Sequence, residues 1–158
     1  DLSGVIAKDC AVREYAMFGI FDQHVNITDG QYVYLRLPEP DSPRSYTYTL
    51  MPARFRGFKK NLETLEIAPA FPFSKNMPLL KIRSSTTWEP AFPDPNHEPG
   101  NLLFSLEDDP HQHSPITKMK VEKKLEKAMA QCLSECAAPA EQYERMSLAV
   151  PDTKVHIK

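Results

Sequence analysis

The sequence predicts an α+β fold in which a small antiparallel sheet of about four strands carries a long C-terminal helix on one face. Two observations predict strands: residues 24–37 alternate around an Asp-Gly dipeptide, and residues 45–51 alternate again. A third predicts the helix, because residues 114–135 repeat their apolar positions with helical spacing. Strands followed by a helix are typical of the α+β class, and 158 residues can bury one core.

The first strands are expected around Asp29-Gly30. Residues 14–21 form an apolar run suited to a buried strand, and residues 24–28 and 31–37 alternate with a period of two. Asp-Gly between two such segments is the strongest short signal for a hairpin, because both residues tolerate a positive φ. The sequence therefore predicts a hairpin with a two-residue turn.

The register of this hairpin predicts what must surround the sheet. A two-residue turn would pair Thr28 with Gln31 and Ile27 with Tyr32, and paired residues point to the same face. One face would carry Val25, Ile27, Tyr32, Tyr34 and Arg36, and the other His24, Asn26, Val33, Leu35 and Leu37. Both faces contain apolar residues, so both need cover, and one helix covers only one of them. We therefore expect an exposed apolar sheet surface and some self-association.

Further elements follow along the chain. Strands are expected at 45–51, 79–82 and 102–106, a basic-aromatic loop at 52–58, a short helix at 62–68 and proline-rich coil at 88–100. Ser114-Pro115 is a good start for the long helix, because Ser caps free amides and Pro suits the first turn.

The expected apolar stripe of the long helix consists of Val121, Leu125, Ala128, Cys132 and Cys136, with Met129 beside it. Most lysines of this segment fall outside the stripe and are expected to face solvent. Pro139 should end the helix, and residues 140–148 suit a second, short one. The last ten residues are expected to form a tail.

Charge and composition exclude several classes of protein. Lys and Arg total 19 against 21 Asp and Glu, which argues against a general binder of nucleic acid or anionic membranes. No apolar run approaches the ~20 residues of a membrane span, and residues 1–20 do not have the pattern of a signal peptide. The expected location is therefore the cytoplasm. Because the chain begins with Asp1 rather than Met, we expect it to be a piece of a longer protein.

Metal binding is not expected. Cys10, Cys132 and Cys136 are a poor disulfide framework, and we interpret the last two as small core residues rather than half of a metal site. His97, His111 and His113 stand near several acidic residues. Such residues also cap and solvate turns, and nothing here predicts an ordered ligand shell.

Three residues are candidates for ligand contacts. His24 begins a strand beside a loop, where it could give a proton or bind an anion, or simply bond to the backbone. Arg54 and Arg56 lie in the basic-aromatic segment 54–60. Arginines there could hold sulfate or phosphate, the aromatic rings could stack on single-stranded nucleic acid, or the segment could be a solvated loop. The glycines and serines form neither a phosphate-binding loop nor a nucleophile elbow.

Several segments together carry a resemblance to a known family. Residues 13–34, the phrase Tyr-Thr-Leu-Met-Pro at 48–52 and the phrase Leu-Leu-Phe-Ser-Leu-Glu-Asp-Asp-Pro at 102–110 resemble, in order, the C-terminal part of bacterial sulfatases. These enzymes belong to the formylglycine-dependent, alkaline-phosphatase-like superfamily. The resemblance covers about residues 1–135 and implies a four-stranded antiparallel sheet with a long helix, docked on a large α/β catalytic domain.

The resemblance also implies a division of residues and roles. It makes residues 1–10 the end of a linker from the catalytic domain, 11–136 the C-terminal subdomain and 137–158 an extension. The protein would hydrolyse sulfate esters, with phosphate esters as the open alternative. This subdomain would complete the fold and shape the substrate cleft, with His24, Arg54 and Arg56 as substrate contacts.

The catalytic centre is expected to lie outside this chain. In the family, a Cys or Ser in Cys/Ser-x-Pro-x-Arg becomes formylglycine, and calcium polarises the sulfate. Residues 50–54 read Leu-Met-Pro-Ala-Arg, with Leu50 at the nucleophile position. We therefore expect no cofactor in this chain and no activity from it alone. A protein of another class, a free-standing α+β binding or interaction module, is the alternative.

Overall fold

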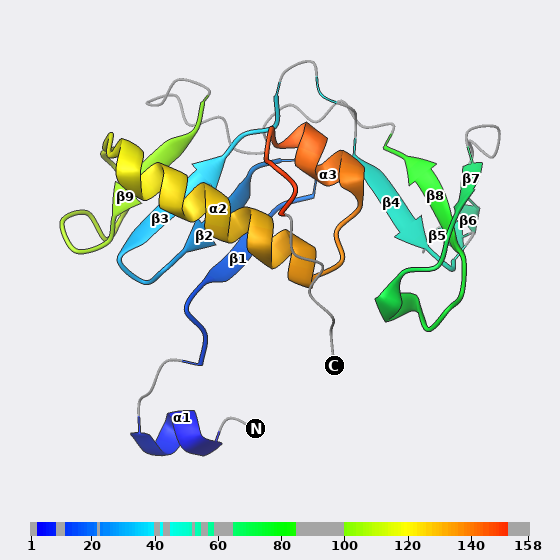
Figure 1. The fold of residues 1–158 in the computed structure, drawn as a ribbon, viewed down its shortest axis with the longest axis horizontal. Coiled ribbons are helices and arrows are strands. Elements are labelled where there is room, and N and C mark those ends of the chain that lie inside the picture. Colours follow the sequence, from blue (N-terminus) through cyan, green and yellow to red (C-terminus); the bar gives the residue numbers. More distant parts are fainter. Residues whose placement is uncertain are drawn as a thin grey trace.

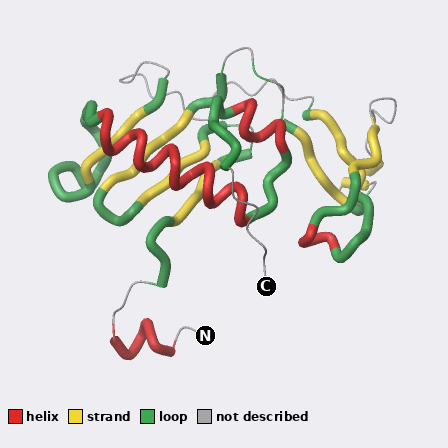
Figure 2. Tube along the Cα trace, viewed as in Figure 1, coloured by secondary structure: helices red, strands yellow, loops and turns green. Residues whose placement is uncertain are grey.

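The computed structural model describes residues 3–8, 12–21, 23–39, 42, 45–51, 53–54, 57–58, 65–84 and 100–151; for 53–54 and 57–58 it describes the backbone. Within these residues the chain forms two larger antiparallel sheets, a two-stranded pair and a helix of 17 residues (Figures 1 and 2). The predicted α+β class is therefore confirmed.

The first sheet is the predicted four-stranded one. It consists of β1 (Ala16–Gly19), β2 (Val25–Thr28), β3 (Tyr32–Arg36) and β9 (Leu102–Ser105), in the order β1-β2-β3-β9. The long helix α2 (Met119–Glu135) lies across one face of this sheet, as Figure 1 shows. The core forms between them and includes the fully buried Ile27, Tyr34, Leu103, Leu125 and Met129.

The hairpin between β2 and β3 has the predicted location but a different register. Thr28 pairs with Val33 and Ile27 with Tyr34, so the connecting loop has four residues rather than two. The Asp29 carboxylate stabilises this loop by accepting hydrogen bonds from the backbone N–H groups of Gln31 and Tyr32, at 3.1 and 2.9 Å. A shift of two residues leaves every side chain on its predicted face. The facial assignment is thus confirmed and the register was wrong.

A second sheet contains strands that we did not expect to separate from the first. It consists of β4 (Tyr46–Thr49), β8 (Leu79–Arg83) and β7 (Leu65–Ala68), in the order β4-β8-β7. The helix predicted at 62–68 is wrong for its described part, because β7 pairs with β8 along its whole length. The short 3-10 helix η2 (Pro72–Ser74) connects them. The predicted basic-aromatic loop contains a two-stranded pair, β5 (Ala53–Arg54) and β6 (Gly57–Phe58).

Helix α2 begins later than predicted. The backbone N–H of Ser114 donates to the Asp109 carboxylate at 2.7 Å, and that of Ile116 donates to the Leu103 carbonyl at 2.7 Å. These bonds hold the segment before Lys118 extended against β9, so the first helical turn forms only at Met119. A favourable capping sequence was outweighed here by pairing with the sheet.

The buried side of α2 is turned slightly from the predicted stripe. Its buried residues are Leu125, Met129, Ala130 and Leu133. Cys132 is partly buried, whereas Cys136 is exposed, so the interpretation of Cys136 as a core residue was wrong. The stripe correctly identified Leu125 but extended too far toward the end of the helix.

The chain after α2 contributes to the core. The predicted short helix is confirmed as α3 (Ala140–Arg145), and Tyr143 and Met146 are buried. Helix α3 lies between the two sheets (Figure 1), and the Lys81 ammonium of β8 pairs with the Glu141 carboxylate at 3.0 Å. The helix α1 (Ser3–Lys8), by contrast, has no buried residue.

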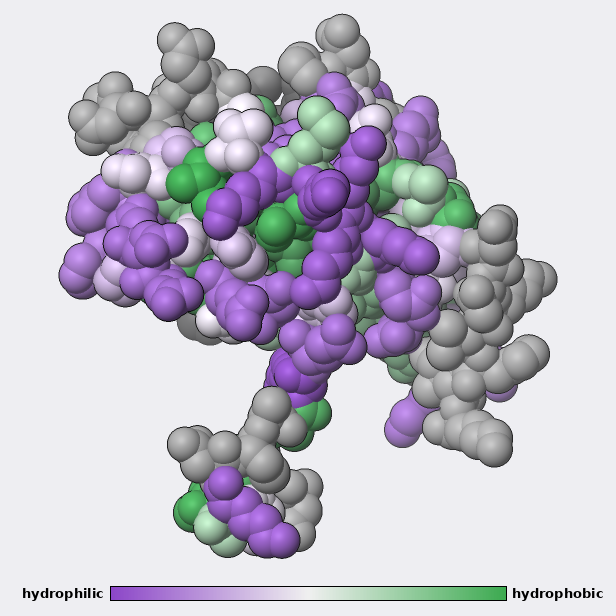
Figure 3. Space-filling view, turned by 60° about the vertical axis from the view of Figure 1, so that its left-hand side comes forward, coloured by the Kyte–Doolittle hydropathy of each residue, from purple (hydrophilic) through white to green (hydrophobic). Residues whose placement is uncertain are grey.

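The predicted first strand is an exposed edge rather than a buried strand. Phe18 is 50% exposed, and the following Ile20 and Phe21 are exposed to a similar degree. β1 pairs on one side only, with β2. Its Met17 packs on the core, whereas Phe18, on the opposite face, stays exposed. The face of the molecule drawn in Figure 3 is largely polar, with small apolar groups between polar ones. Among the described helices, none combines the length and apolar character that crossing a membrane requires.

Candidate functional site

His24 lies immediately before β2, where the backbones of two strands approach closely. The His24 carbonyl oxygen would be 2.6 Å from a Cβ added at Gly19, nearer than real Cβ atoms come. Only glycine therefore fits at the end of β1, and this contact fixes the start of β2. The imidazole itself is partly buried, at the edge of the sheet face that α2 does not cover.

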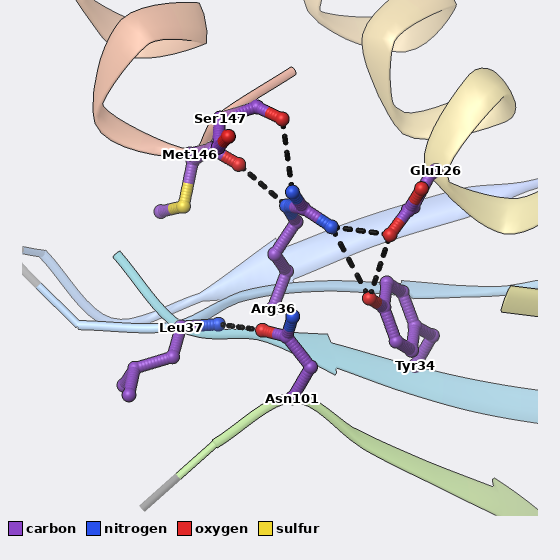
Figure 4. A network of polar contacts seen from close by, with 7 residues as sticks. All are labelled: Tyr34, Arg36, Leu37, Asn101, Glu126, Met146 and Ser147. Atoms are coloured by element: carbon purple, nitrogen blue, oxygen red, sulfur yellow. Dashed lines mark hydrogen bonds and ion pairs between the residues drawn. The ribbon is translucent and has the colours of Figure 1, made fainter. Parts of the chain in front are cut away.

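The surroundings of His24 favour its neutral form. Burial lowers the pKa of the imidazole below its ordinary value of 6.5, and a hydrogen bond with the backbone of Gly100 acts in the opposite direction. Gly100 is held nearby because the neighbouring Asn101 side chain accepts a hydrogen bond from the Leu37 N–H at 2.9 Å (Figure 4). A neutral imidazole can donate one hydrogen bond and accept another, or accept a proton.

This pKa shift predicts a pH dependence of stability. A group whose folded-state pKa is lowered stabilises the fold above its unfolded pKa and loses that contribution as pH falls through the folded value. The free energy of unfolding of the wild type should therefore fall more, from pH 7.5 to about 5.5, than that of His24→Gln. Urea unfolding at both pH values measures this. His111→Gln, which alters an exposed histidine, should keep the wild-type fall; equal falls in all three proteins would contradict the prediction.

A second polar residue, Asn26, lies two residues after His24 and on the same face of the sheet. Asn26 stands opposite Phe18 on β1 and Leu35 on β3. Its side-chain oxygen is buried and has no hydrogen-bond partner among the described residues. A buried acceptor without a partner costs about 1–3 kcal/mol, so a donor that reaches this oxygen would be favoured. His24 and Asn26 together could hold a hydroxyl or an N–H group.

A buried arginine that the sequence pattern did not predict lies near this site. Arg145 of α3 is 5% exposed, and its guanidinium is 3.5 Å from the Gln23 carbonyl, directly before His24. Its own carbonyl accepts a hydrogen bond from the Glu39 N–H at 3.0 Å. Arg145 therefore positions the turn that leads to His24. Its position in the last turn of a short helix gave no signal of burial.

The two predicted arginines are less well defined. Arg54 lies in β5, whose backbone pairs with β6, and Arg56 lies outside the described residues. The β5–β6 pair stands at the far side of the second sheet in Figure 1, whereas His24 precedes a strand of the first. The structure thus places His24 and Arg54 on different sheets, and a common site for the three residues stays a prediction.

The polar network centred on Arg36 in Figure 4 is structural. Arg36, which is 7% exposed, donates hydrogen bonds to the Glu126 carboxylate, to the Tyr34 hydroxyl at 3.2 Å and to the Ser147 carbonyl at 2.9 Å. It also donates to the Met146 carbonyl. Burial raises the pKa of Tyr34 to about 12. Because these donors are used within the fold, the network joins β3, α2 and the end of α3 rather than offering a ligand site.

The acidic turn after β9 is also occupied by internal bonds. The Ser105 hydroxyl donates to the Asp108 carboxylate at 2.7 Å, and Asp109 accepts the N–H of Ser114. The rings of His111 and His113 lie 5.9 Å apart. In the described part of the chain, no group of three or more His, Cys, Asp or Glu side chains could hold a metal ion.

Comparison with protein-family models, with curated proteins and with solved structures produced no match for this chain.

Proposed function

We propose that this chain is the C-terminal subdomain of a formylglycine-dependent sulfatase and that it shapes the substrate cleft of that enzyme. The observation that carries the proposal is the first sheet. Its four antiparallel strands carry one long helix on one face, which is the arrangement that the sequence resemblance implies. The resembling segments contain all of β1, β2 and β9, residues 32–34 of β3 and residues 48–49 of β4.

His24 and Asn26 support a role at the edge of a cleft. They lie on the sheet face opposite α2, and the Asn26 oxygen lacks a donor among the described residues. A hydroxyl group on the leaving-group side of a substrate could supply that donor, while neutral His24 accepts or returns a proton. Arg54 and Arg56 are proposed to add charge that suits an anionic sulfate ester.

The residues of this chain do not fit the family's nucleophile. Formylglycine forms from a thiol or hydroxyl side chain, and the corresponding residue here is Leu50, a hydrocarbon that is 54% exposed. Leu50 therefore cannot serve as the nucleophile. The nucleophile and the calcium ion are proposed to belong to a preceding catalytic domain, which would be the main partner of this chain.

Three measurements test the proposal. The reading frame upstream of Asp1 should encode Cys/Ser-x-Pro-x-Arg a few hundred residues earlier, while the purified chain should not hydrolyse an aryl sulfate. In the complete enzyme, His24→Ala should lower kcat/KM by an amount equivalent to about 1–3 kcal/mol of transition-state binding. An upstream frame without the motif would instead favour the free-standing module. An unchanged kcat/KM with lower thermal stability would make His24 structural.

A further inference from the structure

A groove runs along α2, on the side of the first sheet that this helix covers and opposite the face of His24. It has a volume of about 960 Å³ and is formed by three segments: residues 14–15 before β1, residues 123–131 of α2 and residues 147–151 after α3. Figure 1 shows the last of these segments, in red, ending beside α2. Small-molecule sites in proteins typically occupy about 300–1,000 Å³, so the groove is large enough for an organic ligand. His24 is not among its lining residues.

The walls of the groove are partly apolar. Ala128 and Ala130 line it from α2, and Leu148, Val150 and Pro151 line it from the segment after α3. Leu148 packs on the core, so this wall is held in place by the fold. Val150 is 63% exposed although it is a large apolar residue. Such a surface favours the apolar part of a ligand.

The charged groups of the groove leave two cations without a partner. Lys124 pairs with the Asp29 carboxylate at 3.0 Å, and Glu126 is engaged by Arg36. The Glu14 carboxylate, which also lines the groove, accepts a hydrogen bond from the Tyr15 hydroxyl. Lys123 and Lys127 are both exposed and form no ion pair or hydrogen bond with the described residues. They stand four residues apart, so their ammonium groups share one helix face and repel each other. An anion between them would remove this repulsion.

We propose that this groove binds a small organic anion with an apolar body, such as an aryl or alkyl sulfate, sulfonate or phosphate. Lys123 and Lys127 hold the anionic group, and the wall formed by Leu148 and Val150 holds the apolar part. This site is separate from the proposed cleft residue His24, so it does not depend on the proposed function.

The test compares two dyes of nearly the same shape. Anilinonaphthalene sulfonate carries the anionic group, and its parent phenylnaphthylamine does not. At low salt, fluorescence titration of the wild type should give an affinity for the sulfonate roughly fivefold above that for the parent. Lys123→Gln/Lys127→Gln should remove this preference. Val150→Ser should weaken the binding of both dyes, which places them in the groove.

The matched control removes two charges elsewhere. Lys8→Gln/Lys120→Gln alters two exposed helical lysines outside the groove and should keep the preference for the sulfonate. Equal binding of the two dyes by the wild type, a preference that survives in Lys123→Gln/Lys127→Gln, or unchanged binding by Val150→Ser would overturn the proposal. Displacement of the dye by a polyglutamate peptide but not by naphthalene sulfonate would also overturn it, in favour of an acidic protein partner.

Discussion

Replacing Arg36 with Met should lower the free energy of unfolding by about 3 kcal/mol, the lower end of the usual loss when one partner of a buried ion pair is removed. The Arg36 side chain is 9% exposed and its partner Glu126 is 33% exposed. Arg36→Met leaves the Glu126 carboxylate and two backbone carbonyls without their strongest donor. The loss stays at the lower end because water can still reach Glu126. Urea denaturation followed by circular dichroism measures it.

The matched control breaks a more exposed ion pair between α2 and the β2–β3 hairpin. Lys124 pairs with Asp29; the Lys124 side chain is 55% exposed and that of Asp29 is 8% exposed. Lys124→Met should cost less than about 1 kcal/mol, because water reaches the Lys124 ammonium and the Asp29 carboxylate keeps its hydrogen bonds from the Gln31 and Tyr32 N–H groups. If both variants lost the same free energy, the Arg36 network would not be the main polar link of this fold.

Replacing Met129 with Ala should destabilise the protein by about 2–5 kcal/mol. Met129 is fully buried between α2 and the sheet, so truncation removes buried apolar area and leaves a cavity. The same substitution at Met119, in the first turn of the same helix and 66% exposed, should change the free energy of unfolding by less than about 0.5 kcal/mol.

This pair of variants also tests which side of α2 is buried. Both replace Met with Ala on one helix, so the difference in helix propensity is the same and burial alone separates them. The measurement is again the midpoint and slope of urea unfolding. Equal effects at Met119 and Met129 would show that α2 does not pack on the sheet through Leu125, Met129 and Leu133.

Local patterns determined much of the first sheet. Alternation in residues 24–37 and the Asp29-Gly30 signal correctly predicted two strands joined as a hairpin and the face of each side chain, but not the length of the turn. Leu125 was assigned correctly to the buried side of α2 for the same kind of reason, because helical periodicity is a local property. His24 was placed at a strand edge from the strand pattern alone. These features depend on residues that are close in the sequence.

The remaining features depended on contacts between distant residues. β7 (Leu65–Ala68) is a strand because its backbone pairs with β8, although its own sequence also suits a helix. Ile116 stays extended because it bonds to Leu103, and Arg145 is buried because α3 packs between the sheets. The sequence by itself therefore determined the fold class, the hairpin and the helix. Only the tertiary structure decided the second sheet, the start of α2 and the buried polar groups, because their hydrogen bonds join segments whose partners a local pattern does not specify.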